Sequence, residues 1–172
     1  MVKQLVAKIQ SALFRVAMSV ASSTAEDGLE IFHEPGMPAS AGACAKISGA
    51  LGLVREYDPR RYLRLRRDLN RLVVVAEVGF RVLPDLRAGT LNESYVQRCS
   101  TLELAFALVE MASRARIGRR HHARLLEPRY QQRVWRRSTL EQLAFAASLP
   151  SSMGTALEHV KTALEQKLAA SS

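Results

Sequence analysis

The stretch LVEMASRARI places Glu110 and Arg114 four residues apart, a spacing that puts both side chains on one face of an α-helix. A glutamate that precedes an arginine by four residues has the favourable orientation for a helical ion pair. A metal centre is disfavoured there, because Arg114 is a permanent cation and Met111 cannot accept a proton. The stretch therefore predicts a structural ion pair rather than a catalytic centre.

Arginine accounts for 20 of the 25 basic residues, and the chain carries a net charge of +9. Residues 55–137 hold nineteen basic and nine acidic residues, so the positive excess lies in the centre of the chain. A planar guanidinium forms bidentate contacts with phosphate or carboxylate, which suits recognition of an anionic partner. The side chains expected to contact that partner are Arg60, Arg64, Arg67, Arg71, Arg133, Arg136 and Arg137.

The class of anionic partner stays open at this stage. Nucleic acid is one alternative, but aromatic side chains make up 6% of the chain and no helix-turn-helix or zinc-finger pattern is present. An anionic membrane surface is a second alternative. Arginine-rich helices also pair with the acidic residues of a partner protein, and this is the interpretation that we favour.

The histidines and cysteines show no pattern typical of a metal site or a nucleophile. His33 and Glu34 form an HE pair, but the proline and glycine that follow would break the helix that a metal motif requires. The adjacent histidines at 121–122 point in different directions on a helix. Cys44 and Cys99 have no histidine or acid nearby in sequence that would mark a nucleophile. Two cysteines outside any CxxC are too few for a disulfide framework, which indicates a reducing compartment. We expect a cytoplasmic protein without a cofactor or metal.

Local signals predict the elements that position these residues. Asp58 followed by Pro59 is typical of an N-cap, and Ser100 with Glu103 is typical of a capping box. The β-branched run at 72–78 predicts a strand, with weaker strands at 80–86 and 90–96. Helices are expected over residues 39–56, 58–71, 100–117 with Gly118 closing the last of these, 128–149, and 151–168 with Ser151 or Ser152 as its cap. Core positions of the last two helices are expected at Val134, Leu140, Leu143, Phe145, Leu157, Val160, Leu164 and Leu168.

The N-terminal region predicts an amphipathic helix and a linker, over residues 1–38. Its apolar positions alternate at spacings of four and three, and they are Val2, Val6, Ile9, Leu13, Val16 and Val20. Three roles are open for this stripe: docking on the domain or on a second copy of the chain, lying on a membrane surface, or filling a partner's groove. Residues 24–38 are rich in acids, glycine and proline and predict an irregular linker.

The length of 172 residues fits a single domain over residues 39–172. No window reaches 18 uncharged apolar residues, so no transmembrane helix is expected. A small sheet must be covered by helices on at least one face. The expected fold is therefore α+β and mostly α, with helices packed around a small β-sheet and a C-terminal helix closing the domain.

The order of these segments resembles a family of bacterial hypothetical proteins that carries a zinc-peptidase motif of the form LVHEATHARL. The resemblance runs from about Ala50 to Pro150, more than half of the chain. Laid without a gap on LVEMASRARI, it puts Glu110 and Arg114 where the two histidines belong and Met111 where the glutamate belongs. The resemblance implies a third metal ligand near Trp135, which is also missing.

The resemblance implies a zincin-like scaffold whose metal site is degenerate at Glu110, Met111, Arg114 and Trp135. Such a protein is expected to be a non-catalytic binding or accessory subunit that acts through amphipathic helices and its arginine-rich surface. A basic nucleic-acid-binding protein, or a peripheral membrane protein anchored by its N-terminal helix, is the alternative. An ordinary helix with a chance likeness to the motif is the simplest alternative of all.

Overall fold

The computed structural model describes residues 23–26, 28–34, 41–76, 80–120 and 127–170. The expected amphipathic helix at 1–22 and the histidine pair at 121–122 lie outside these residues. None of the helices in the described part has the length and apolar content needed to cross a bilayer.

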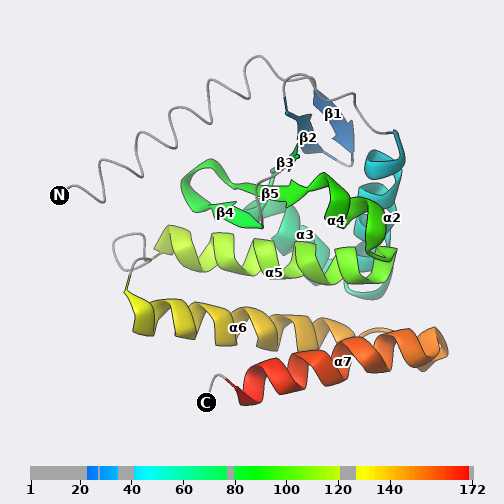
Figure 1. Ribbon diagram of the computed structural model, residues 1–172, viewed down its shortest axis with the longest axis vertical. Coiled ribbons are helices and arrows are strands. Elements are labelled where there is room, and N and C mark those ends of the chain that lie inside the picture. The colour runs from blue at the N-terminus through cyan, green and yellow to red at the C-terminus, as the bar shows by residue number, and fades with distance from the viewer. Residues whose placement is uncertain (1–22, 27, 35–40, 77–79, 121–126, 171–172) are drawn as a thin grey trace.

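A five-stranded mixed sheet forms one layer of the fold (Figure 1). Its three inner strands are parallel, and each edge strand is antiparallel to its neighbour. The spatial order is β1-β2-β3-β5-β4. In chain order the strands are β1 (Ser23–Glu26), β2 (Leu29–His33), β3 (Arg71–Val75), β4 (Arg81–Leu83) and β5 (Ala88–Asn92).

The middle strand, β3, confirms the expected strand over residues 72–75, while the chain bends at residue 76 and residues 77–78 of that prediction lie outside the described part. Leu72, Val73, Val74 and Val75 are all buried, because β3 has a parallel neighbour on each side. A parallel strand in the middle of a sheet reads as a continuous apolar run, which is why this segment was recognisable in sequence.

The first two strands overturn the expectation of an irregular linker over residues 24–38. Gly28 has a φ of +71°, which allows a tight turn between β1 and β2. Leu29 and Ile31 are fully buried while Glu30 is exposed, so β2 alternates as a half-buried strand does. Because β2 pairs with β3, this segment belongs to the same sheet as the rest of the chain.

The segment after β3 confirms one weak strand and partly overturns another. The strand expected over 80–86 is present as β4, followed by a 3-10 turn, η1 (Pro84–Leu86). The strand expected over 90–96 is wrong beyond Asn92. The side chain of Asn92 accepts a hydrogen bond from the Tyr95 amide and so begins a short helix, α4 (Glu93–Arg98).

Two consecutive helices, α2 (Ala41–Tyr57) and α3 (Pro59–Asp68), connect the parallel strands β2 and β3. The N-cap signal between them is confirmed, since the Asp58 carboxylate accepts a hydrogen bond from the Arg61 amide at 2.8 Å and Pro59 opens the helix. Helix α3 ends at Asp68, three residues before the expected end at residue 71. Arg71 therefore lies on a strand and not on the helix.

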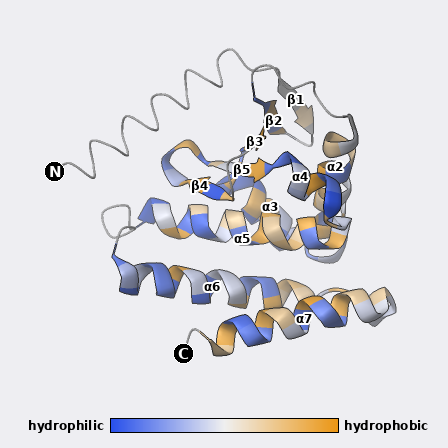
Figure 2. Cartoon of the chain, in the orientation of Figure 1, coloured by the Kyte–Doolittle hydropathy of each residue, from blue (hydrophilic) through white to orange (hydrophobic). Residues whose placement is uncertain are grey.

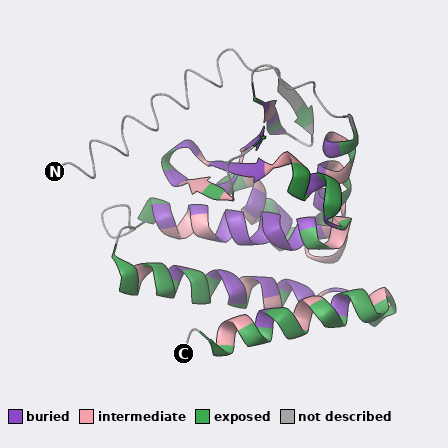
Figure 3. Ribbon diagram, in the orientation of Figure 1, coloured by how far each residue is buried: buried purple, intermediate pink, exposed green. Residues whose placement is uncertain are grey.

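Helix α5 (Thr101–Arg120) lies between the sheet and the outer helices, and Figure 3 shows it buried through most of its length. Its capping box is confirmed: the Ser100 amide donates to the Glu103 carboxylate at 2.7 Å, and the Glu103 amide donates to the Ser100 hydroxyl at 3.1 Å. The expectation that Gly118 ends the helix is wrong. Gly118 is buried within it, and the helix continues to Arg120.

Helices α6 (Pro128–Ala146) and α7 (Gly154–Ala169) form the outer layer. Phe145 of α6 meets Phe106 of α5 edge-on, with the ring centroids 5.2 Å apart. Leu140, expected in the core, is 47% exposed. Figure 2 shows that the first half of α6 is mostly hydrophilic and that its apolar residues lie mainly in the second half.

The C-terminal helix begins later than expected. Neither serine caps it, because residues 151–153 form a separate 3-10 turn, η3 (Ser151–Met153), and Gly154 follows with a φ of +64°. Leu157 and Leu164 are buried against the rest of the protein, as their spacing predicts. The structure thus confirms a mostly helical α+β fold with a small mixed sheet.

Candidate functional site

The degenerate motif residue Glu110 lies at the centre of a charged cluster between α5, α6 and α7. Its carboxylate contacts the Arg114 guanidinium at 2.5 Å and the Lys167 ammonium at 3.4 Å. The Gln142 side-chain amide donates to the same carboxylate at 3.1 Å and to the Phe106 carbonyl. We call Glu110, Arg114, Gln142 and Lys167 the Glu110 network. The helical ion pair expected between Glu110 and Arg114 is therefore present.

One aromatic ring lies beside each of the two cations of the Glu110 network. The Lys167 ammonium lies 4.2 Å from the centroid of the Trp135 ring, and the Arg114 guanidinium lies 5.4 Å from that of Phe80. Arg114 and Trp135 also line one pocket of about 400 Å³ with Val82, Pro84, Gln131 and Val134. Glu110 and Trp135 are 25 residues apart in the sequence, and the fold brings both of them into one region with Arg114.

Met111, the remaining residue of the degenerate motif, lies on the opposite side of α5. It is fully buried against the sheet, where a Cβ on Gly89 would lie only 2.9 Å from the Met111 sulfur. Successive residues of a helix are turned by roughly 100° from each other, so Met111 faces β5 while Glu110 faces α6 and α7. Met111 is therefore a core residue, and Gly89 provides the room for it.

The Glu110 network is poorly suited to a metal ion. Arg114 and Lys167 place two positive charges beside its one carboxylate. Across the described residues, no group of three or more His, Cys, Asp or Glu side chains is arranged to hold a metal. The side chains around Glu110 are therefore those of an ion-pair network and not those of a metal site.

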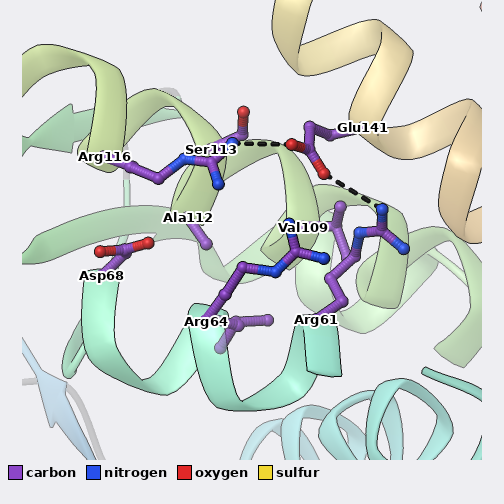
Figure 4. Close-up of a pocket in the computed structure, with 9 residues that line it drawn as sticks. Arg61, Arg64, Asp68, Val109, Ala112, Ser113, Arg116 and Glu141 are labelled. Atoms are coloured by element: carbon purple, nitrogen blue, oxygen red, sulfur yellow. Dashed lines mark hydrogen bonds and ion pairs between the residues drawn. The ribbon is translucent and has the colours of Figure 1, made fainter. Parts of the chain in front are cut away.

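A second set of ion pairs ties α3 to α5 and α6 (Figure 4). The Glu141 carboxylate accepts hydrogen bonds from Arg116 at 2.7 Å and from Arg61 at 3.1 Å. Arg61 also contacts Asp58 at the start of α3. Burial alone would raise the pKa of Glu141, but the hydrogen bonds and charges of Arg116 and Arg61 outweigh it and hold that pKa below its usual range.

The acid at the end of α3 is held in a similar way. Asp68 is 2% exposed, and its carboxylate contacts Arg119 of α5 and the neighbouring Arg67. Arg64 extends between Asp68 and Glu141 in Figure 4, on the surface where α3 meets α5. The space enclosed there is about 20 Å³, enough for one water molecule.

Beside this junction lies a larger pocket of about 320 Å³, which we call the arginine cleft. Its lining comes from three helices and comprises Arg64, Arg116, Ile117, Arg120, Arg137 and Glu141. Among the described residues the lining thus holds four arginines and one carboxylate, and that carboxylate is already paired with Arg61 and Arg116. Within the described residues, Arg64, Arg120 and Arg137 have no acidic partner.

The arginine cleft contains two of the seven arginines expected to contact a partner, Arg64 and Arg137. Sequence reasoning did not single out Arg116 and Arg120. Their spacing of four places them on one face of α5. A local pattern does not show that this face lies beside α3 and α6, where the other arginines of the cleft are. The signal that could have found them is the arginine-rich end of the helix, residues 114–120.

The other expected arginines lie outside the cleft. Arg60, Arg133 and Arg136 are exposed on α3 and α6. Arg67 is also exposed but contacts Asp68, and Arg71 contacts Glu30 of β2 at 2.8 Å. The helix expected over residues 58–71 would have carried Arg71 together with Arg60, Arg64 and Arg67. That expectation is wrong for Arg71, which lies on β3.

The cysteines and histidines also acquire neighbours that the sequence did not reveal. Cys99 is buried, and burial raises the pKa of its thiol. His159 is exposed on α7, as expected. His33 lies beside Cys44, eleven residues further along the chain. The fold brings these two side chains together, and no local spacing predicts it.

Comparison with known proteins identifies no relative: no family model, no curated protein and no solved structure matches the chain. The function of the protein must therefore be argued from its own residues.

Proposed function

We propose that this protein is a non-catalytic binding subunit that holds an acidic segment of a partner protein in the arginine cleft. The observation that supports the proposal is the charge of the lining: four arginines surround one glutamate, and that glutamate already has two arginine partners. A pocket with an excess of guanidinium groups gains most from a ligand that brings carboxylates.

The architecture of the cleft favours binding without rearrangement. Its arginines project from α3, α5 and α6, and the Arg61–Glu141 and Arg116–Glu141 pairs join these three helices. Helices that are joined in this way hold their side chains in place before the ligand arrives, which reduces the entropy lost on binding. The cleft is thus a preformed receptor for acidic side chains.

An acidic peptide suits the cleft better than a nucleic acid does. The positive side chains converge on one pocket, whereas a phosphate backbone is bound by a basic track that follows its repeating charges. The exposed Trp135 lies against Lys167 on the far side of the α5–α6 contact and does not line the arginine cleft, so the cleft offers no aromatic ring among its described lining for a base to stack on. The exposed Arg133 and Arg136 lie on the helix that also carries Arg137 and would add charge at the edge of the same interface.

The proposal includes an origin for the Glu110 network. We propose that the scaffold is metallopeptidase-like and that Glu110, Met111 and Arg114 stand where a zinc site has been lost. Support comes from the two cationic contacts of Glu110 and from the position of Trp135 beside Lys167. Zinc content of the natural chain, beside that of a Glu110→His, Met111→Glu, Arg114→His variant, tests this. Stoichiometric zinc in the natural chain contradicts it.

Fluorescence anisotropy with a labelled peptide of alternating glutamate and glycine tests the binding function. The double variant Arg64→Gln, Arg137→Gln is expected to bind roughly a hundredfold more weakly, because two charge-assisted contacts of about 1.5 kcal/mol each are lost. The matched control is Arg81→Gln, Arg98→Gln, which removes the same charge from exposed positions on β4 and α4.

Two outcomes would reject the proposed function. Equal weakening in both double variants would mean that the peptide responds to net charge and not to the cleft. Tighter binding of a DNA duplex, or of vesicles that contain phosphatidylserine, would assign the protein to a different class of partner.

A further inference from the structure

Cys44 and His33 form a thiol–imidazole pair at the junction of β2 and α2. The Cys44 sulfur lies 3.5 Å from Nε2 of His33, within hydrogen-bond distance for sulfur. His33 is the last residue of β2, and Cys44 is in the first turn of α2. The pair therefore results from the fold and not from neighbouring positions in the chain.

The surroundings of the two side chains differ in a way that matters for reactivity. His33 is 1% exposed, and its Nδ1 is buried without a hydrogen-bond partner in the part of the chain that the structure describes. Buried polar atoms are almost always paired, so an unpaired ring nitrogen calls for a reason. Cys44 is partly exposed and also packs against the hydrophobic core. The imidazole is therefore shielded from solvent, and the thiol is shielded only in part.

The second cysteine shows what an unreactive thiol looks like in the same protein. Cys99 is 8% exposed, and its sulfur contacts the Val96 carbonyl at 3.6 Å. It has no imidazole among its described contacts, and its burial disfavours the charged thiolate. Cys44 differs from it in exposure, in its imidazole neighbour and in its place at the start of a 17-residue helix.

We propose that Cys44 is a modification site for low-molecular-weight disulfides, with His33 as the base that accepts the thiol proton. The Cys44 sulfur attacks one sulfur of the disulfide RSSR, the S–S bond breaks, and a Cys44–S–S–R bond forms. The thiol proton passes to Nε2 of His33 and then to the leaving thiolate, which departs as RSH. No electrons are gained or lost overall, because one disulfide replaces another.

Two physical effects favour this step at Cys44. The thiolate is the attacking species, so a base 3.5 Å from the sulfur increases the fraction of encounters that lead to reaction. The positive end of the α2 dipole lies at its first turn, where it stabilises the developing negative charge on sulfur. Cys99 has neither the base nor the exposure.

The test uses the full chain incubated with oxidised glutathione, followed by peptide mapping by mass spectrometry. At pH 6.5 the rate of mixed-disulfide formation at Cys44 is expected to exceed that at Cys99 by about a hundredfold or more, which is the usual size of general base catalysis. His33→Gln is expected to slow Cys44 by roughly tenfold to a hundredfold at that pH and less at pH 9, where a free thiol is already largely ionised. Circular dichroism checks that the variant is folded.

Exposure alone could make Cys44 faster than Cys99, so a second comparison isolates the imidazole. A synthetic peptide of residues 41–48 gives the rate of the same thiol without a fold. The proposal requires the folded protein to react faster than the peptide at pH 6.5, and this comparison holds even if His33→Gln does not fold. A Cys44 rate at or below that of the peptide, or an unchanged rate in folded His33→Gln, would overturn the proposal.

Discussion

The two sides of the contact between α5 and α6 use the same chemistry to different ends. On one side Glu110 contacts Arg114 and Lys167, and on the other Glu141 contacts Arg61 and Arg116. Each carboxylate therefore has two cationic partners. The pocket beside Glu110 adds a second carboxylate, that of Glu103, whereas the Glu141 side adjoins a cleft with three more arginines.

The difference arises from one helix. Helix α7 places Lys167 beside both the Glu110 carboxylate and the Trp135 ring of α6, and we call this the closed side because its carboxylate and its two cations are paired with each other. The lining of the arginine cleft contains no residue of α7. Adjacent residues of α6, Glu141 and Gln142, serve the two sides. Both networks hold two cations for one carboxylate, so what remains for a partner is the further excess of arginines beside Glu141.

The largest effect is expected on the closed side. Glu110→Gln removes the charge that Arg114 and Lys167 share and should lower the free energy of unfolding by about 2 kcal/mol. Urea unfolding followed by circular dichroism measures this. Glu158→Gln, which removes a pair with Lys161 on the exposed face of α7, is the control and should cost no more than about 0.5 kcal/mol. Equal losses would mean that the Glu110 network is no stronger than a surface pair.

Glu141→Gln tests the open side and should act in two directions. The free energy of unfolding should fall by about 1 kcal/mol, because Arg61 and Arg116 lose their shared partner in a site that solvent partly screens. Binding of the glutamate peptide should tighten several-fold, since Arg116 becomes free to contact the ligand. Glu110→Gln should leave peptide affinity unchanged. Weaker binding in Glu141→Gln would show that the ordering of the cleft by Glu141 matters more for affinity than its competition with the ligand for Arg116.

The pH dependence of stability sharpens the same comparison. Because the pKa of Glu141 is lowered in the folded protein, the unfolded chain binds the proton more readily and stability rises with pH. The contribution of Glu141 is present above its unfolded pKa of about 4.3 and is lost as the pH falls through its lower folded value. The difference in unfolding free energy between the natural chain and Glu141→Gln should therefore shrink between pH 6 and pH 3. A constant difference would contradict the assigned cause.

The smallest expected effect has the opposite sign. Arg137→Gln removes a charge from the cleft, where it is repelled by Arg64, Arg116 and Arg120, and should raise the free energy of unfolding by about 0.5 kcal/mol. Arg114→Gln, on the closed side, should lower it. Thermal unfolding at low ionic strength distinguishes the two changes. Destabilisation by both would mean that the cleft arginines are structural.

The parts of the fold that could be predicted are those whose causes lie within a few residues. The Asp58 cap and the Ser100–Glu103 capping box act across three residues, and the burial of β3 needs only its own apolar run. The edge strand β1 could not be predicted, because an acidic segment becomes a strand only through its partner. The inner strand β2 does alternate, with Leu29 and Ile31 buried and Glu30 exposed, but the acids, glycine and proline around it favoured a linker.

The candidate sites divide in the same way. The Glu110–Arg114 pair follows from helical spacing alone. Lys167, which completes that network, is 57 residues away from Glu110, and the Arg61–Glu141 pair spans 80 residues. Contacts of this length depend on how α3, α6 and α7 pack on α5, and the sequence predicts those helices without predicting their neighbours.

The close approach of Met111 to Gly89 has a consequence for how the molecule opens. A strand residue without a side chain lets the buried helix α5 lie directly on β5, so neither can separate from the other without exposing the centre of the core. Backbone amides in the middle of α5 and in β5 should then exchange their hydrogens together, in the slowest class of the protein, while those of the outer helix α7 exchange earlier. A glycine that makes no side-chain contact of its own thereby determines which part of the chain is the last to unfold.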